Sequence, residues 1–166
     1  MKILVSDTSV LIDLERGGLL DSCFRLPFEF AVPDLLYARE LKDFGGPALV
    51  AHGLRVEELS GDEVAAAQAV RAAHQKLSLP DAFAYTLASL RSWTLLTGDG
   101  ELRTLAHVQG VPFFGVLWVL DQLFEAQVIE AKVIVAGLEV IAAHPRCRLP
   151  RAEIQSRLER YRKRKT

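Results

Sequence analysis

The chain has 166 residues, of which 50% are hydrophobic and 25% are charged, and its formal net charge is -1. That length suits one domain with its own core, and the hydrophobic fraction excludes a wholly disordered chain. No apolar run approaches the roughly 18 residues that span a bilayer, and we expect no signal peptide because the first apolar run is too short. Cys23 and Cys147 do not form a metal-spaced pair, so we expect reduced thiols and a cytoplasmic protein.

The near-zero net charge conceals an uneven distribution along the chain. Residues 1–145 carry 11 Lys or Arg and 19 Asp or Glu, whereas residues 146–166 carry nine and two. A basic tail of this kind attracts phosphate backbones and acidic partners. A solvated helical end has the same composition, so both interpretations stay open.

Short apolar runs alternate with helical patterns along the first part of the chain. The predicted strands are Lys2–Ser6, Phe28–Val32, Leu54–Leu59, Trp93–Thr97 and Val111–Phe114. The predicted helices between them are Ser9–Arg16, Leu19–Arg25, Pro33–Asp43, a segment from Ser60 to about Leu77, a segment from Ser78 to about Arg91, and Glu101–Val108. Gly45-Gly46-Pro47 is expected to break the third of these helices, and Ser60 with Glu63 matches a capping box. Apolar strands alternating with helices predict a parallel sheet covered on both faces.

Three further helices are predicted toward the carboxyl terminus. They are Val116–Ala126, Ile129–His144 and Arg151–Lys163. The middle helix leaves little polar face, because apolar residues occupy most positions between 133 and 141. Such a helix is either deeply buried or packed against another chain, and the sequence does not decide between the two.

Four carboxylates are candidates for a functional site at one edge of this sheet. Asp7 and Asp99 directly follow the first and fourth strands, whereas Glu40 and Asp81 lie on helices. Ligands of an open parallel sheet bind outside the carboxyl ends of its strands, so we expect these side chains to converge there. Each has a structural alternative: the helix dipole accounts for Asp81, turn chemistry for Asp99 and solvation for Glu40. Asp7 is the hardest to explain structurally, since a charge after a buried strand needs a partner.

Carboxylates that converge repel one another unless a cation lies between them. A divalent cation removes that repulsion and keeps the acids ionised, and carboxylate oxygens suit Mg²⁺ or Mn²⁺. The four histidines are scattered at 52, 74, 107 and 144, so no zinc-type spacing competes. The acids therefore predict a magnesium or manganese site.

Four short motifs in this order resemble the PIN domain, most closely the VapC-like ribonucleases of toxin–antitoxin pairs. The motifs are Val5-Ser6-Asp7-Thr8-Ser9-Val10-Leu11-Ile12, Ala38-Arg39-Glu40-Leu41, Leu79-Pro80-Asp81-Ala82 and Leu96-Thr97-Gly98-Asp99. The resemblance covers roughly residues 2–125 and implies a three-layer α/β/α sandwich with a central parallel sheet of about five strands. We accordingly divide the chain into a nuclease domain over 1–127 and a helical extension with a basic tail over 128–166, packed on that domain or on a dimer partner.

The resemblance also implies a metal-dependent endoribonuclease and assigns its residues. Asp7, Glu40, Asp81 and Asp99 match the acidic quartet, with Asp7, Asp81 and Asp99 as metal ligands. Thr8 or Ser9 matches the hydroxyl that orients the first acid, and Thr97 matches the hydroxyl near the fourth. Glu101 stands where many relatives carry a further Asp, so it is a candidate ligand and the number of metal ions stays open.

Substrate and partners follow from the same resemblance. Single-stranded RNA or a structured RNA loop is the expected substrate, because splayed bases can stack and be recognised. Cations at the rim of an acidic site must attract that RNA, and Lys42, Arg103 and the basic tail are the candidates. A small antitoxin protein and a homodimer are the expected protein partners, and no membrane association is expected. The alternative function is a catalytically weak or inactive PIN-like module that binds RNA or protein.

Overall fold

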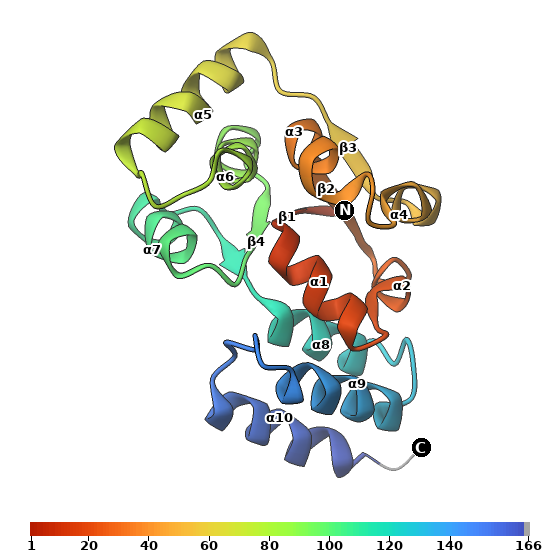
Figure 1. Cartoon of the computed structure of the whole chain (residues 1–166). Helices are drawn as coiled ribbons and strands as arrows, with labels where there is room; N and C mark the ends of the chain where they lie inside the picture. The colour runs from red at the N-terminus through yellow and green to blue at the C-terminus, as the bar shows by residue number, and fades with distance from the viewer. Residues whose placement is uncertain (165–166) are drawn as a thin grey trace.

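The computed structural model describes residues 1–164, which form a five-stranded, all-parallel sheet flanked by helices (Figure 1). The strand order is β3-β2-β1-β4-β5. The strands are β1 (Lys2–Ser6), β2 (Phe28–Pro33), β3 (Arg55–Glu57), β4 (Thr94–Leu96) and β5 (Phe113–Phe114). The predicted three-layer α/β/α fold with a central parallel sheet is confirmed.

The central strands are buried on both faces, and alternate residues enter two separate cores. Leu4 and Leu96 belong to the core beneath α1 (Thr8–Arg16) and α8 (Val116–Glu125), whereas Val5 and Leu95 belong to the core beneath α5 (Gly61–Ala73) and α6 (Leu79–Arg91). Successive side chains of a strand point to opposite faces, so a continuous apolar run supplies both cores.

The helices are α1 (Thr8–Arg16), α2 (Leu20–Cys23), α3 (Asp34–Leu36), η1 (Tyr37–Leu41), α4 (Gly46–His52), α5 (Gly61–Ala73), α6 (Leu79–Arg91), α7 (Gly100–Gln109), α8 (Val116–Glu125), α9 (Ala131–Ala143) and α10 (Arg151–Arg162).

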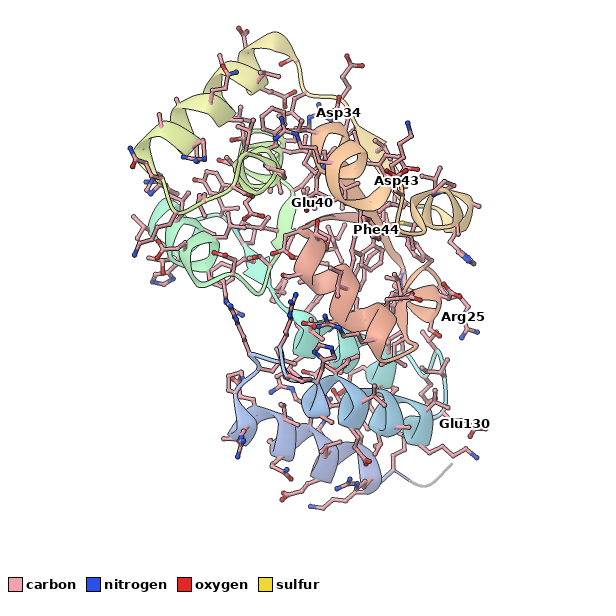
Figure 2. The ribbon with its side chains drawn as sticks, in the orientation of Figure 1. Arg25, Asp34, Glu40, Asp43, Phe44 and Glu130 are labelled. Atoms are coloured by element: carbon pink, nitrogen blue, oxygen red, sulfur yellow. The ribbon has the colours of Figure 1, made fainter. Side chains whose placement is uncertain are left out.

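The segment after β2 differs most from the sequence prediction of one helix over Pro33–Asp43. Pro33 ends the strand, α3 lasts one turn, and η1 is a π-helix in which the Lys42 amide donates to the Tyr37 carbonyl at 2.8 Å. The predicted break at Gly45-Gly46-Pro47 is the start of α4, because Gly45 turns the chain at φ 87° and Pro47 lies in the first helical turn. Figure 2 shows Asp43 and Phe44 on the turn between η1 and α4, and the Phe44 side chain is 79% exposed.

The capping predictions agree with the structure, although the helix after Ser60 is shorter than expected. Ser60 and Glu63 form the capping box of α5, which ends at Ala73 rather than near Leu77. Ser78 caps α6, where its hydroxyl accepts from the Asp81 amide at 3.1 Å. These caps depend on residues three apart in sequence, which is why they are predictable locally.

The carboxyl-terminal helices pack onto the sheet layer of the same chain. Ile134 and Leu138 of α9, together with Leu158 of α10, belong to the core cluster that contains Leu4 of β1. Helix α9 comes close to the end of α1, since a Cβ at Gly137 would lie 2.8 Å from the Gly17 carbonyl oxygen. Two large apolar residues of α9 remain exposed, Val133 at 43% and Val140 at 55%.

Most arginines of α10 pair with acidic residues of this chain. Arg157 lies 3.1 Å from the Asp121 carboxylate on α8, and Arg162 lies 2.6 Å from Glu139 on α9. Arg160 pairs with Glu125 as well. The charge of the helical part of the tail is therefore largely compensated within the chain, while Lys165 and Thr166 lie outside the described residues.

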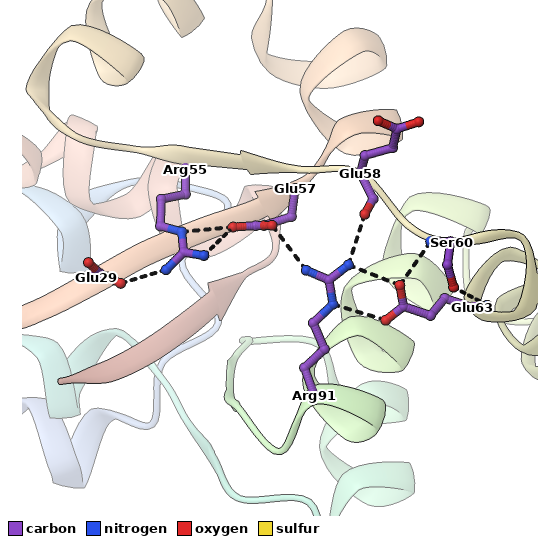
Figure 3. A network of polar contacts seen from close by, with 7 residues as sticks. All are labelled: Glu29, Arg55, Glu57, Glu58, Ser60, Glu63 and Arg91. Carbon is purple, nitrogen blue, oxygen red and sulfur yellow. Dashed lines mark hydrogen bonds and ion pairs between the residues drawn. The ribbon is translucent and has the colours of Figure 1, made fainter.

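A network of ion pairs fastens the edge strand β3 to the neighbouring helices (Figure 3). Glu57 lies between two guanidinium groups, at 2.6 Å from Arg55 and 3.0 Å from Arg91. Arg91 also pairs with Glu63 at the start of α5, at 2.9 Å. Both guanidinium groups lie near the Trp93 ring, at 5.3 and 5.2 Å from its centroid.

Over residues 1–164, none of the helices combines the length and the apolar composition that crossing a membrane requires.

Candidate active site

Asp7 is the most buried acid of the chain and occupies the corner between β1 and α1. It is 2% exposed and caps α1, where one carboxylate oxygen accepts from the Val10 amide at 3.0 Å and from the Ser9 hydroxyl at 2.9 Å. Its other oxygen accepts from the Thr97 hydroxyl, which itself accepts from the Asp99 amide at 3.0 Å. Thr97 thus links the ends of β1 and β4 through a single hydroxyl group.

The surroundings of Asp7 destabilise its ionised form, so that its pKa is raised. Burial raises the pKa of Asp7, and the nearby charge of Asp99 raises it further, although the hydrogen bonds from Thr97, Val10 and Ser9 lower it. Three donors around a buried carboxylate stabilise its charge only in part. An added positive charge at this corner would remove the remaining penalty.

Asp99 and Asp81 both lie at helix amino termini. Asp99 caps α7, where its carboxylate accepts from the Leu102 amide at 3.0 Å, and Asp81 lies in the first turn of α6. Helix amino termini carry partial positive charge and favour acids. Both carboxylates lie near Asp7, since Thr97 joins the Asp99 amide to the Asp7 carboxylate and the charges of Asp7 and Asp99 both act on Asp81.

The pKa of Asp81 shows that the four acids share one electrostatic environment. The pKa of Asp81 is raised to about 6, because burial and the charges of Asp7, Asp99 and Glu40 outweigh the lowering effect of a hydrogen bond with Ser78. Like charges shift a pKa in this way only when they lie close together or share a poorly solvated space. Acids separated by up to 92 positions in the sequence are therefore gathered by the fold.

Glu40 comes from the π-helix η1 and accepts a hydrogen bond from the Thr8 hydroxyl. Figure 2 shows it beside the upper end of α1. The π-helical turn widens the helix at this residue, and such turns occur often at functional sites. Thr8 and Ser9 were alternative predictions for the hydroxyl that orients the first acid; Ser9 donates to Asp7, whereas Thr8 donates to Glu40.

The remaining predicted site residues lie outside this cluster. The Glu101 side chain is 52% exposed, and its carboxylate lies 3.7 Å from the Lys76 amino group. The guanidinium of Arg103 lies 5.3 Å from the centroid of the Phe113 ring and 3.3 Å from the position that a Cβ at Gly115 would take. Lys42 is exposed just after η1. Arg103 thus faces the end of β5, next to the strand that leads to Asp99.

The chemistry of the donor set suits a hard divalent cation, but the side chains do not form a ready ligand shell. Within residues 1–164, no three His, Cys, Asp or Glu side chains are arranged so that they could hold a metal ion as they stand. Mutual repulsion keeps ionised carboxylates apart, and a cation would draw their oxygens together. The oxygen chemistry of these acids and the effect of their charges on the pKa of Asp81 fit Mg²⁺ or Mn²⁺, for which the carboxylates would have to approach one another.

An apolar groove that was not predicted from the sequence adjoins Glu40. Its volume is about 650 Å³, and it lies between α1, α2 and the segment from η1 to α4. Leu11, Ile12 and Phe44 provide much of its apolar lining, and Glu15 lies at its polar margin together with Glu40. The sequence holds no signal for this groove, because the exposure of Ile12 at 42% and of Phe44 at 79% becomes evident only in the folded chain.

A family model described as PIN domain matches residues 3–163. The match includes all four clustered acids and extends through the carboxyl-terminal helices, beyond the region of roughly 2–125 in which the motifs occur. A search of curated proteins finds no match. The chain belongs to the PIN domain family, whose members are generally nucleases that usually use divalent metal ions.

Proposed function

We propose that this protein is a Mg²⁺- or Mn²⁺-dependent endoribonuclease that cleaves single-stranded RNA or RNA loops. The observation that carries the proposal is the Thr97 hydroxyl, which joins the Asp7 carboxylate to the Asp99 amide, and the charges of Asp7, Glu40 and Asp99, which raise the pKa of Asp81, agree with it. Clustered acids destabilise the metal-free site and stabilise a bound cation. That combination is what metal-assisted phosphodiester hydrolysis requires.

The residues divide into ligands and orienting groups. Asp7, Asp81 and Asp99 hold the metal ion, and the hydroxyls of Ser9 and Thr97 fix the Asp7 carboxylate. Glu101 serves as a further ligand only if a second ion binds, because it pairs with Lys76 in its present position. A bound Mg²⁺ or Mn²⁺ lowers the pKa of water and neutralises phosphate charge.

Glu40 is the group that orients the attacking water and accepts its proton. The Thr8 hydroxyl holds the Glu40 carboxylate beside the start of α1, at the rim of the acidic cluster. The water oxygen bonds to phosphorus, the bond to the leaving ribose oxygen breaks, and a proton returns to that oxygen from solvent. Arg103 and Lys42 are the rim cations that attract the RNA phosphates.

The test is cleavage of an end-labelled single-stranded RNA by the purified chain with Mn²⁺, with Mg²⁺ and with EDTA. We expect metal-dependent cleavage by the parent protein and its loss in Asp7→Asn, with Lys132→Gln as the control for a remote surface change. A parent chain that binds the RNA but does not cut it with either metal would instead support the non-catalytic PIN-like module.

We further propose that this ribonuclease is a VapC-like toxin acting in the cytoplasm and inhibited by a small antitoxin. The apolar groove beside Glu40 supports this proposal, because an amphipathic helix could fill it while an Arg or Lys of that helix reaches the acids. Expression of the chain alone should arrest bacterial growth, and Asp81→Asn should relieve the arrest. Harmless expression of a protein that cleaves RNA in vitro would contradict the toxin role and leave the nuclease role intact.

A homodimer is the remaining proposed assembly. Val133 and Val140 on the outer side of α9 support it, since both are apolar and exposed one above the other on the helix. Light scattering after size exclusion should give twice the chain mass, and Val140→Glu should shift the protein to the monomer.

A further inference from the structure

The connection between α9 and α10, residues 144–150, is a basic segment whose side chains alternate in exposure. We call it the α9–α10 loop. Cys147 and Leu149 are partly buried and pack against the core. Arg146, which precedes Cys147, and Arg148, which lies between the two, are exposed. Arg151, also exposed, begins α10 directly after the loop. The packing of the alternate residues anchors the loop and directs its arginines to solvent.

Local hydrogen bonds and two prolines restrict the loop further. The Arg146 amide donates to the His144 ring at 3.1 Å, and the Cys147 amide donates to the His144 carbonyl at 2.9 Å. Pro145 and Pro150 fix the backbone angle φ near both ends of the loop. Ordering these arginines on a ligand therefore costs less backbone entropy than it would in a flexible tail.

The loop arginines differ in charge compensation from those of α10. Arg157, Arg160 and Arg162 all pair with carboxylates of α8 or α9. For Arg146, Arg148 and Arg151, by contrast, no acid of the described chain lies within 4.0 Å of the guanidinium. In the described part of the tail, the positive charge without an acidic partner therefore lies at two places, the loop with Arg151, and Lys163 with Arg164 after α10, where Arg164 donates to the Phe124 carbonyl.

The loop begins alongside the helix that carries the acidic cluster at its amino terminus. Burial raises the pKa of Asp13 on α1, and the charges of Arg16 and His144 lower it, so His144 lies near this turn of α1. Asp13 is six residues beyond Asp7, which is about 9 Å along a helix axis. In Figure 1 the loop is drawn below the connection from β5 to α8, on the side of the molecule where α7 lies.

We propose that Arg146, Arg148 and Arg151 bind phosphates of the RNA strand outside the cleavage site. The identity of the strand rests on the proposed function, whereas the uncompensated charge and the fixed loop come from the structure. An acidic catalytic cluster repels a phosphate backbone, so affinity must come from cations placed away from the metal. Guanidinium groups bind phosphate oxygens in a bidentate manner, which suits them to this task better than ammonium groups.

Binding is measured by fluorescence anisotropy with a labelled single-stranded oligoribonucleotide in EDTA over a series of NaCl concentrations. Without metal the assay does not depend on cleavage. The variants are Arg146→Gln and Arg148→Gln, and the matched control is Arg25→Gln, an exposed arginine that Figure 2 shows on the opposite side of the molecule. Circular dichroism melts check that all variants fold like the parent.

Each loop variant should bind RNA more weakly than the parent protein. The slope of log affinity against log salt should be smaller in magnitude by about 0.7 for each phosphate group that the variant no longer neutralises. Arg25→Gln should retain the parent slope. Equal slopes for parent and loop variants would overturn the proposal, as would a parent that does not bind the RNA. Loss of binding to an acidic polypeptide, with RNA binding unchanged, would assign the loop to a protein partner instead. Metal-dependent cleavage, measured separately, decides the proposed function independently of these results.

Discussion

At the scale of single residues, the site consists of acids whose ionised forms repel one another. Asp7 is buried with three hydrogen-bond donors and still has a raised pKa. Asp81 has a pKa of about 6 because of burial and the charges of three neighbouring acids. Residues selected only for stability would not be arranged in this way, and perturbed acids in a cluster are typical of functional sites.

The raised pKa of Asp81 predicts how metal-free stability depends on pH. Between the unfolded value of 3.8 and about 6, the folded state binds more protons than the unfolded state, so stability falls as pH rises through this range and then stays level. Asp81→Asn should therefore raise the metal-free melting temperature at pH 7 and flatten the pH dependence. Melts from pH 4 to about pH 7.5 test this.

The same variant should lose the stabilisation that Mn²⁺ confers on the parent. A ligand that binds only the native state raises the melting temperature, and protonation of Asp81 below about pH 6 should weaken that effect in the parent. Asp62→Asn, on the first turn of α5, is the control for removing an exposed acid. An Asp81→Asn protein that is less stable without metal and keeps the full Mn²⁺ shift would contradict this assignment.

At the scale of elements, the predictable parts are those whose signals are local. The strand ends at Asp7 and Asp99 follow from continuous apolar runs, and the caps at Ser60 and Ser78 follow from spacing. The π-helix around Glu40 could not be predicted, since its widened hydrogen bonding has no sequence signature. Helix α4 was missed because Gly45 and Pro47 terminate helices as readily as they start them.

The close contact between α1 and α9 makes a prediction for Gly137. A Cβ there would lie 2.6 Å from the Leu19 side chain and 2.8 Å from the Gly17 carbonyl oxygen, so the helices would have to separate. Gly137→Ala should destabilise the protein by about 1–3 kcal/mol, although alanine favours helices. The measurement is the free energy of unfolding in urea.

Gly61→Ala is the matched control for that measurement. Gly61 also lies in a helix, at the start of α5, and a Cβ there would meet nothing within 4 Å. We expect it to be neutral or to stabilise by about 0.4–1 kcal/mol. Equal effects of the two substitutions would mean that the α1–α9 contact is looser than described.

At the scale of the whole molecule, the carboxyl-terminal helices complete the core beneath the sheet. Tyr161 of α10 has no exposed surface, packs on Phe124 at 4.6 Å between ring centroids, and donates its hydroxyl to Asp121. The sequence could not show this, because the partners of the tail arginines lie on α8 and α9, about 20 to 40 positions away. Only a three-dimensional contact distinguishes a compensated arginine from a free one.

Two substitutions of Tyr161 separate packing from hydrogen bonding. Tyr161→Ala removes a fully buried ring and should cost about 3–5 kcal/mol of unfolding free energy, comparable with other large core truncations. Tyr161→Phe keeps the ring and leaves Asp121 with its arginine partners, so it should cost only about 1 kcal/mol. A small effect of Tyr161→Ala on thermal unfolding would show that α10 is dispensable for the core.

The ion pairs around Arg91 also provide an optical probe of the sheet edge. The Trp93 indole lies close to two guanidinium groups, and Arg55 among them belongs to β3 itself. Detachment of β3 would change the polarity around this fluorophore while the rest of the sheet stays intact. Trp118, the second tryptophan, lies on α8 against Phe114, so a Trp118→Phe protein would report emission from the β3 edge alone.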